Sequence, residues 1–336
     1  MSRTGEYTRQ LDQLRRSDEP RFGGKSSSLG ELLAAEIPVP PGFALAAAAF
    51  SEFAREPSVA DAIAASRGIG EAMRAAAMPS EVREELLRAY AELGEPAVAV
   101  RSSALGEDSE EATFAGQQET FLWVRGADQV CDVVRDCWIS LYSPTAVSYR
   151  ARLGQTVEPA MGVTVQAMVD AEVSGVMFTC NPVSGDPSMV AVNASWGLGL
   201  AVVGGEVTPD DYLVSKVTRE VVRAQVHDKH VQYVPDPEGQ GVICVDVPPD
   251  RREARCLSDE ALAALVDVAK RVERHFGSRQ DVEWAIARDT EPPDGLYLLQ
   301  SRPVTAVAKP AASPPPSSAI AAVMTTFGAN AKREST

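Results

Sequence analysis

The chain lacks the features that mark membrane, secreted or nucleic-acid-binding proteins. No stretch approaches the roughly 18 apolar residues that a transmembrane helix needs, and the N-terminus has no apolar centre of a signal peptide. Lys and Arg number 32 against 47 Asp and Glu, which leaves a net charge of −15 without any basic block to offset it. We therefore expect a soluble, cytoplasmic protein that binds neither nucleic acid nor a membrane.

Cysteine is scarce, and its spacing indicates no site. The number of cysteines is odd, and no two of them form a C-x-x-C pair or a zinc-type spacing. Reduced thiols are the simplest interpretation, and they fit a cytoplasmic setting. The five cysteines are Cys131, Cys137, Cys180, Cys244 and Cys256.

What remains is the composition of an ordinary globular protein. Hydrophobic residues make up 45% and charged residues 24% of 336 residues, enough for one large domain or two modest ones. Helical and strand patterns intermix without regular strand–helix–strand alternation, which predicts the α+β class. Helices are expected within 29–33, 58–93, 127–150 and 258–276, and strands at 97–101, 120–124, 161–169, 174–179, 189–193, 212–216, 218–226, 282–287 and 296–299.

A glycine-rich turn, Gly23-Gly24-Lys25-Ser26, precedes the first short helix, and Ser26–Ser28 are candidate N-caps of that helix. The turn is not a Walker P-loop, because that motif requires glycine at position 19, which is Glu19. Glycines allow an anion to approach the backbone, and a lysine beside them can neutralise it. Most such turns are only turns, so Lys25 is a candidate that needs support from elsewhere.

Arg101 stands at the end of a predicted buried strand and enters a polar loop that contains glycine. A guanidinium in that position suits bidentate phosphate binding. The alternative is an ordinary surface arginine paired with Glu107 or Asp108. The residues themselves leave both interpretations open.

Two predicted strands near the end of the chain carry polar residues two positions apart. Asp281 and Glu283 share one face of the first strand, and Gln300 and Arg302 share one face of the second. A D-x-E pair alone is common on solvated strands. If the strands are neighbours, however, carboxylate and amide oxygens lie beside a guanidinium, as a magnesium–nucleotide site requires.

With these segments in place, the chain resembles the N-terminal nucleotide-binding domain shared by phosphoenolpyruvate synthase, pyruvate phosphate dikinase and rifampicin phosphotransferase. The resemblance lies between residues 23 and 305 and keeps the family's order and spacing. The stretches that carry it are GGKSSSLGEL, VPPGFAL, AVRSSALGEDSEEATFAGQQETFLWV, VQAMVDAEVSGVMFTCNPVSG, SWGLGLAVVGGEVTPDDYLVSK and DVEWAI followed by LYLLQSRPVT.

The resemblance implies an ATP-grasp fold of the α+β class, with two lobes that clamp Mg-ATP. We expect the N-terminal lobe at 1–165 and the C-terminal lobe at 166–305. A stiff proline-rich linker at 306–318 and a tail at 319–336 are expected after them.

The resemblance also implies roles for individual residues. Lys25 and Arg101 hold phosphates, Glu283 and Gln300 coordinate Mg²⁺, and Arg302 stabilises charge on the phosphate being transferred. A loop closes over the triphosphate through the backbone N–H groups of Thr113, Phe114, Ala115, Gly116 and Gln117. The remaining nucleotide contacts are Gln166, Met168 and Val169 for adenine and Glu172 for the ribose.

Two positions depart from the family's pattern. The usual G-L-G-E reads Gly197-Leu-Gly-Leu200, which removes an acidic side chain. The family commonly has a basic residue between the positions of Gln166 and Met168, and this chain has Ala167 there. Both changes bear on nucleotide binding rather than on the fold.

In the family, ATP phosphorylates a histidine on a separate swivelling domain, with release of AMP and phosphate, and the phosphoryl group passes on to a small-molecule acceptor. That histidine stands in a T-x-G-G-x-x-x-H setting. His227, His230 and His275 are the only histidines here, and none follows two glycines in this way. We therefore expect the histidine on another domain or on a partner protein.

Three functions stay open at this point. The first is an ATP-binding subunit or domain that phosphorylates a histidine in trans. The second is a self-sufficient kinase or ligase that acts directly on a small acceptor. The third is a degenerate nucleotide-binding module with a structural or regulatory role, which only Ala167 and Leu200 favour.

Overall fold

The computed structural model describes residues 7–105, 119–152, 159–237, 239 and 241–304, and contacts divide the chain into two units. The expected boundary lies between residues 165 and 166, whereas the contacts divide the chain after Met168 and assign one short segment from each side to the other unit. The expected linker and tail, 306–318 and 319–336, lie outside the described residues. Unit 1 consists of Met1–Ala34, Pro40–Met168 and Pro237–Gly241, and unit 2 of Ala35–Val39, Val169–Asp236 and Val242–Thr336.

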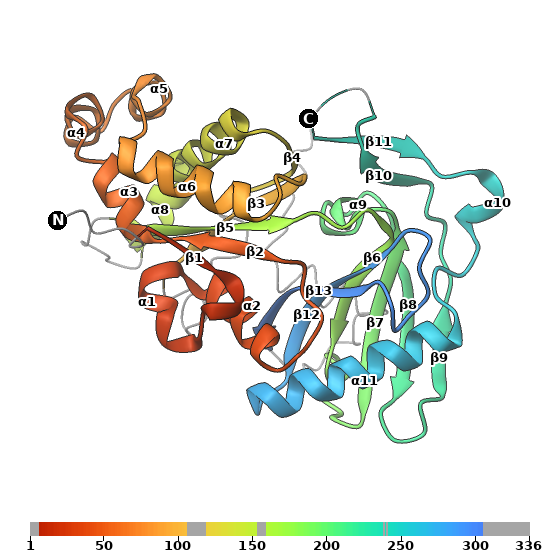
Figure 1. Ribbon diagram of the computed structural model, residues 1–336. Helices are drawn as coiled ribbons and strands as arrows, with labels where there is room; N and C mark the ends of the chain where they lie inside the picture. The colour runs from red at the N-terminus through yellow and green to blue at the C-terminus, as the bar shows by residue number, and fades with distance from the viewer. Residues whose placement is uncertain (1–6, 106–118, 153–158, 238, 240, 305–336) are drawn as a thin grey trace. The chain divides into compact units, whose positions relative to one another are not determined.

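Unit 1 is built on a five-stranded sheet in which every neighbouring pair is antiparallel (Figure 1). The strand order is β1-β2-β5-β3-β4, so β2, β5 and β3 each have a partner on both sides. The strands are β1 (Thr8–Gln10), β2 (Gly42–Leu45), β3 (Val98–Ala104), β4 (Thr120–Val124) and β5 (Met161–Ala167).

Helices cover both faces of this sheet. Figure 1 shows α1 and α2 on one face and α3, α6 and α7 on the other. The second face carries the apolar core of the unit, where the rings of Phe53 and Trp138 lie 5.3 Å apart. The helices are α1 (Glu19–Phe22), α2 (Gly24–Ala34), α3 (Ala47–Phe53), α4 (Pro57–Ala64), α5 (Ile69–Ala75), α6 (Ser80–Glu92), α7 (Ala127–Ser140) and α8 (Pro144–Arg152), with 3-10 turns at Leu11–Gln13 and Arg16–Asp18.

Unit 2 contains a six-stranded antiparallel sheet with the order β13-β12-β6-β7-β8-β9 and a separate hairpin, β10-β11. The long helix α11 runs across one face of the sheet (Figure 1). The elements are β6 (Ala171–Phe178), β7 (Met189–Trp196), α9 (Leu200–Val203), β8 (Asp210–Ser215), β9 (Val221–Gln225), β10 (Val231–Pro235), β11 (Val242–Asp246), α10 (Pro249–Arg252), α11 (Asp259–Phe276), β12 (Gln280–Ala287) and β13 (Leu296–Pro303).

Helix α11 begins and ends where its sequence indicates. The Ser258 hydroxyl accepts a hydrogen bond from the Ala261 N–H at 3.1 Å, and Asp259 and Glu260 occupy the first turn. Gly277 ends the helix in the left-handed conformation at φ 66°. One stripe of the helix is buried, and it is made of Ala261, Leu262, Leu265, Val266, Val268, Ala269 and Val272.

The prediction that serines cap the first helix is wrong. Ser26–Ser28 lie inside α2, which already begins at Gly24. Gly23, at φ 82°, carries the chain so close to β3 that an added Cβ would lie 2.3 Å from the Ser103 carbonyl oxygen. The hydroxyl of Ser26 is instead 2.7 Å from Thr164 Oγ1 on β5, a buried contact between α2 and the sheet.

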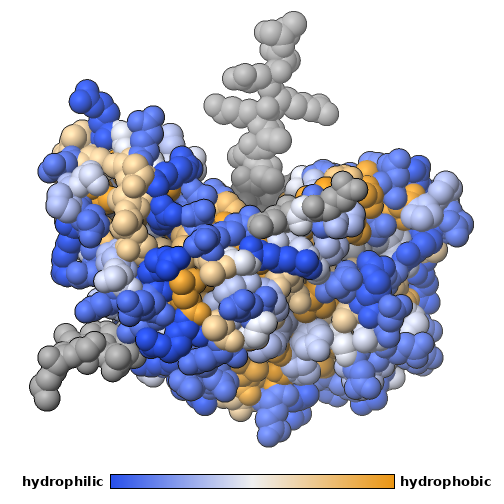
Figure 2. All heavy atoms as spheres, turned by 45° about the horizontal axis from the view of Figure 1, so that its top comes forward, coloured by the Kyte–Doolittle hydropathy of each residue, from blue (hydrophilic) through white to orange (hydrophobic). Residues whose placement is uncertain are grey.

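The visible face in Figure 2 is largely hydrophilic, with apolar side chains in small groups among polar ones. The large apolar side chains that are most exposed in the described part are valines and one isoleucine, Ile243, rather than aromatic residues. None of the described helices combines the length and apolar character that a bilayer crossing requires.

Candidate functional site

Lys25 is buried in unit 1, where α2 lies against β3. It lies in the first turn of α2 with only 4% of its surface exposed, and its ammonium donates to the Ser102 carbonyl at 3.0 Å. Burying an ammonium is costly unless polar groups surround it. A lysine held in this way indicates a built polar site, a more specific role than that of a surface turn.

Arg101 lies on β3, next to the strand residue that Lys25 contacts. Side chains alternate along a strand, so Arg101 shares a face with Ser103. The Ser103 hydroxyl accepts a hydrogen bond from the Ser26 N–H at 3.3 Å, so this is the face that α2 covers. The structure therefore brings the two predicted phosphate-binding cations, Lys25 and Arg101, into one region of unit 1.

The predicted triphosphate loop cannot be compared with the structure. Thr113, Phe114, Ala115, Gly116 and Gln117 lie outside the described residues. The same holds for the two acidic residues that were the alternative partners of Arg101, Glu107 and Asp108.

The predicted adenine contacts divide between the units. Gln166 is 2% exposed and donates through Nε2 to the Pro40 carbonyl at 3.4 Å. The Met168 N–H donates to the Ala97 carbonyl at 2.9 Å. Val169 begins the second segment of unit 2. Adenine recognition by these residues stays a prediction.

Strands β12 and β13 are neighbours, as the candidate magnesium site requires. In the register of this antiparallel pair, Glu283 lies opposite Gln300, and Asp281 lies opposite Arg302. Glu283 is half-buried and Gln300 is 8% exposed. The carboxylate, the amide and the guanidinium that the sequence pattern placed on two strand faces are thus brought together as cross-strand pairs.

Asp281 was not assigned a role from the sequence, but it contacts a residue that was. Its Oδ2 accepts a hydrogen bond from Arg302 Nε at 3.0 Å, and its side chain is 6% exposed against 28% for Arg302. Burial raises the pKa of the Asp281 carboxyl to about 6, while the Arg302 guanidinium opposes that rise. The contact limits the rotation of the guanidinium of Arg302.

The donor set at this place fits magnesium rather than a fully protein-ligated metal. No group of three or more His, Cys, Asp or Glu residues in the described part of the chain could hold a metal ion. Glu283 and Gln300 offer two oxygen donors on adjacent strands. Mg²⁺ is commonly bound by one or two protein oxygens together with water and substrate phosphates, so the pair is sufficient for a nucleotide-borne ion.

Glu172, the predicted ribose contact, lies at the start of β6 and already has two partners. Its carboxylate forms ion pairs with Arg251 and Arg288. These arginines are 79 and 116 residues away in the sequence, and neither belongs to a recognisable motif. No local pattern could have found them, because only the folded sheet of unit 2 brings them to Glu172.

The two departures from the family's pattern are both at element ends. Ala167 is the last residue of β5, and Leu200 is the first residue of α9, where it is half-buried. Neither position is occupied by a charged side chain.

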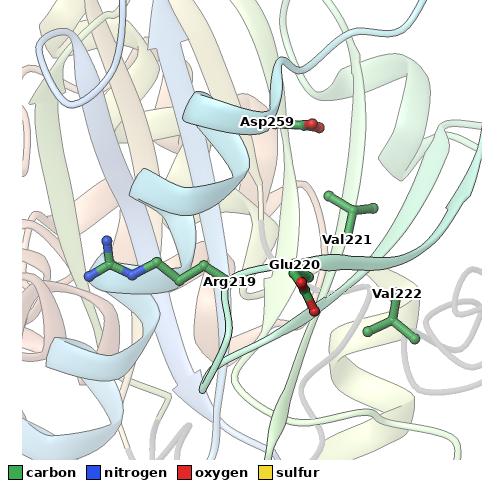
Figure 3. A pocket seen from close by; sticks show the side chains of 5 residues that line it. All are labelled: Arg219, Glu220, Val221, Val222 and Asp259. Carbon is green, nitrogen blue, oxygen red and sulfur yellow. The ribbon is translucent and has the colours of Figure 1, made fainter.

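A surface pocket of about 530 Å³ lies elsewhere in unit 2 and contains none of the predicted residues. Figure 3 shows its lining, which comes from the turn before β9, from β9 itself and from the start of α11. Arg219, Glu220, Val221, Val222 and Asp259 line it. Its mixture of opposite charges and two valines matches no part of the candidate nucleotide site.

The chain belongs to the family described as pyruvate phosphate dikinase, AMP/ATP-binding domain, which it matches over residues 19–319. Family membership, with the mixed helices and antiparallel sheets, confirms the α+β fold of the ATP-grasp type. Among solved structures, PH1788 from Pyrococcus horikoshii Ot3 gives a TM-score of 0.41 at 11% identity, over 88% of this chain and 97% of that one. That likeness is too distant to carry an argument.

Curated relatives are phosphoenolpyruvate synthases. The chain is 40% identical over 321 residues to the probable phosphoenolpyruvate synthase of Archaeoglobus fulgidus, covering 89% of this chain and 42% of that protein. It is 37% identical over 360 residues to phosphoenolpyruvate synthase of Pyrococcus furiosus, covering 89% and 44%. For the probable phosphoenolpyruvate synthase of Methanocaldococcus jannaschii the identity is 38% over 322 residues, and the shares are 89% and 27%. The chain thus spans less than half the length of these relatives.

Proposed function

We propose that this chain binds Mg-ATP and passes a phosphoryl group to a histidine on a separate domain or partner protein. AMP and phosphate are released, and the phosphohistidine then serves a small-molecule acceptor. The family and the relatives named phosphoenolpyruvate synthase support the ATP-dependent phosphotransferase class. The in-trans histidine and the acceptor are inferred from the resemblance and from the absence of a G-G-x-x-x-H histidine in the sequence.

The products define which bonds change. Release of AMP requires the bond between the α-phosphate and the β-phosphate to break, and release of free phosphate requires water to cleave the bond between the β-phosphate and the γ-phosphate. The histidine nitrogen attacks the β-phosphorus of ATP, so the bond to the α-phosphate breaks and AMP leaves. ATP, water and histidine therefore yield AMP, phosphate and phosphohistidine in balance.

The chain's own residues position and neutralise charge, which is most of what phosphoryl transfer needs. Lys25 and Arg101 would bind phosphate oxygens. Glu283 and Gln300 would hold Mg²⁺, which, when bound, neutralises charge on the phosphates. Arg302, oriented by Asp281, would stabilise the charge that develops on the transferred group.

The observation that carries the proposal is the pairing of β12 with β13. Each of the three residues expected to act on magnesium or on the transferred phosphoryl group lies on this one strand pair, and two of them are directly opposite one another.

The test is nucleotide product analysis with purified chain and Mg-ATP, with and without a protein that carries the T-x-G-G-x-x-x-H segment. We expect AMP, and acid-labile phosphate on the added protein, only when both proteins are present. A partner variant in which that histidine is alanine is the control and should give neither. Formation of ADP by the chain with a small acceptor, or no turnover despite bound ATP, would contradict the proposal.

A further inference from the structure

Two arginines that have no part in the proposed chemistry enclose the carboxylate of Glu172 in unit 2. Arg251 Nη2 contacts Oε1, and Arg288 Nη1 contacts Oε2. A carboxylate has about four acceptor positions, so each oxygen retains capacity after one arginine contact. The side chains of all three residues are between 28% and 38% exposed, so a ligand can reach the group.

Local strand geometry aims Glu172 at this place. In the pairing of β12 with β6, Ile286 lies opposite Val173 and Ala287 opposite Ala171, so the register shifts around Glu172. An irregularity of this kind changes the direction of the side chains next to it. Just after it, the Arg288 N–H donates to the Asp170 carbonyl at 2.8 Å, and Arg288 Nε lies 3.5 Å from Asp170 Oδ2.

Arg251 is fixed from the other side by an aromatic ring. Its guanidinium carbon lies 4.0 Å from the ring centroid of Trp196, which is 8% exposed. The indole N–H of Trp196 donates to the Arg251 carbonyl at 3.0 Å, so side chain and backbone are both held. Stacking on the ring of Trp196 leaves the planar guanidinium of Arg251 little rotational freedom.

The chemistry of this arrangement favours a ligand with two adjacent hydroxyl donors. Each oxygen of Glu172 contacts one guanidinium and can accept one further hydrogen bond. A vicinal diol supplies two donors at matching positions, whereas an anion would meet the carboxylate itself. Acidic residues contact the ribose hydroxyls of dinucleotides for the same reason.

We propose that Arg251 and Arg288 are positioning residues that hold Glu172 for the ribose diol of ATP and thereby set a preference for ribonucleotide over deoxyribonucleotide. This inference rests on the proposed function, because it takes ATP as the ligand. The inference adds to the proposed function by naming the groups that distinguish ribose from deoxyribose. The discrimination is a ratio of two affinities, so it is separable from the overall strength of binding.

The experiment measures dissociation constants of Mg-ATP and of its 2′-deoxy and 3′-deoxy analogues by calorimetry on the whole chain. We expect the wild type to bind ATP about tenfold or more tightly than either analogue, since a hydrogen bond to a charged acceptor is lost. Glu172→Gln should bring the ratio close to one. Arg251→Met and Arg288→Met should each lower it, with the affinity for the deoxy analogues nearly unchanged.

Arg255→Met is the matched control. Arg255 also lies over an aromatic ring, Tyr212, at 5.5 Å from its centroid, and pairs with a carboxylate, Asp259, but it does not contact Glu172. Its removal should leave the ratio as in the wild type. Arg251→Lys and Arg288→Lys retain the charge without the fork and serve if a methionine variant does not fold. They too should lower the ratio.

The outcomes separate this inference from the proposed function. Equal loss of affinity for all three nucleotides in the Arg251 and Arg288 variants would overturn it, because that pattern indicates structural damage. A wild type that binds ATP and both analogues equally would overturn it while leaving phosphoryl transfer intact. A wild type that binds none of them would overturn the proposed function together with the inference.

Discussion

Replacing Arg302 by methionine is expected to lower the rate of phosphoryl transfer to the histidine-bearing protein by about a thousandfold. Arg302 is the residue assigned to stabilise the negative charge on the transferred phosphoryl group. Its contact with Asp281 on the neighbouring strand orients the guanidinium. A charge that acts on the transition state changes kcat far more than it changes ATP binding. The dissociation constant of Mg-ATP should therefore change by less than about tenfold.

The measurement is a single-turnover assay of AMP formation, run with the substituted and unsubstituted chains. Since the change leaves Asp281 buried without its arginine partner, thermal melting is recorded in parallel and rates are compared where both proteins are folded. Arg219→Met is the control, because Arg219 forms an exposed ion pair with Asp267. A rate within about tenfold of the wild type for Arg302→Met would show that Arg302 is not the transition-state charge.

Replacing Lys229 by methionine is expected to destabilise unit 2 by about 3–5 kcal/mol. Lys229 and Asp210 are both 0% exposed, and their Nζ and Oδ1 atoms lie 2.6 Å apart. Asp210 also accepts hydrogen bonds from the Tyr212 hydroxyl and from the Cys256 N–H, both at 2.9 Å. Removing the lysine leaves a buried carboxylate without its cation, which costs far more than the pair itself contributes.

Hydrogen exchange of peptides from β8 to β11, under increasing urea, measures this loss within unit 2. The double variant Asp210→Asn/Lys229→Met should recover part of the lost stability, because no buried charge then remains. The exposed pair of Arg219 with Asp267 is the comparison, and Arg219→Met should cost no more than about 1 kcal/mol. Equal, small effects at both pairs would mean that the buried pair is better solvated than its burial indicates.

Much of the fold was predictable because local patterns agree with the final packing. Strands were predicted at Val282–Ala287 and Leu296–Leu299, and both form in the structure. The capped, amphipathic segment that begins at Ser258 formed the expected helix. The segments 212–216 and 218–226 were both predicted as strands, and they overlap β8 and β9, which pair with each other antiparallel. In each case a short-range signal specifies the same element that the core requires.

Other features depend on contacts that no local pattern encodes. Ser26 resembles a cap in sequence, but the close approach of Gly23 to β3 starts the helix earlier and turns the serine into a buried contact. Arg251 reaches Glu172 from a short helix between β11 and α11, and Arg288 reaches it from beyond the end of β12. Ala35–Val39 joins unit 2 although the chain on either side belongs to unit 1.

The candidate site was predicted from residue types, and the structure adds the pairing of the two strands that carry it. The structure pairs Glu283 with Gln300 across neighbouring strands, as the pattern required. It also shows that Asp281, which has no assigned role although it shares a strand face with Glu283, contacts Arg302. Spacing identifies which residues share a strand face. Which of these residues contact each other depends on strand register and burial, which spacing does not give.

The most direct test of the account is the magnesium dependence of ATP binding in the wild type and in Glu283→Gln. Calorimetry of the wild type should give an affinity at least about tenfold higher with Mg²⁺ than with a chelator, since Glu283 and Gln300 are assigned to the ion. Glu283→Gln should lose most of this difference, whereas Glu260→Gln, an exposed glutamate at the start of α11, should keep it. An undiminished magnesium effect in Glu283→Gln would contradict the assignment of the site.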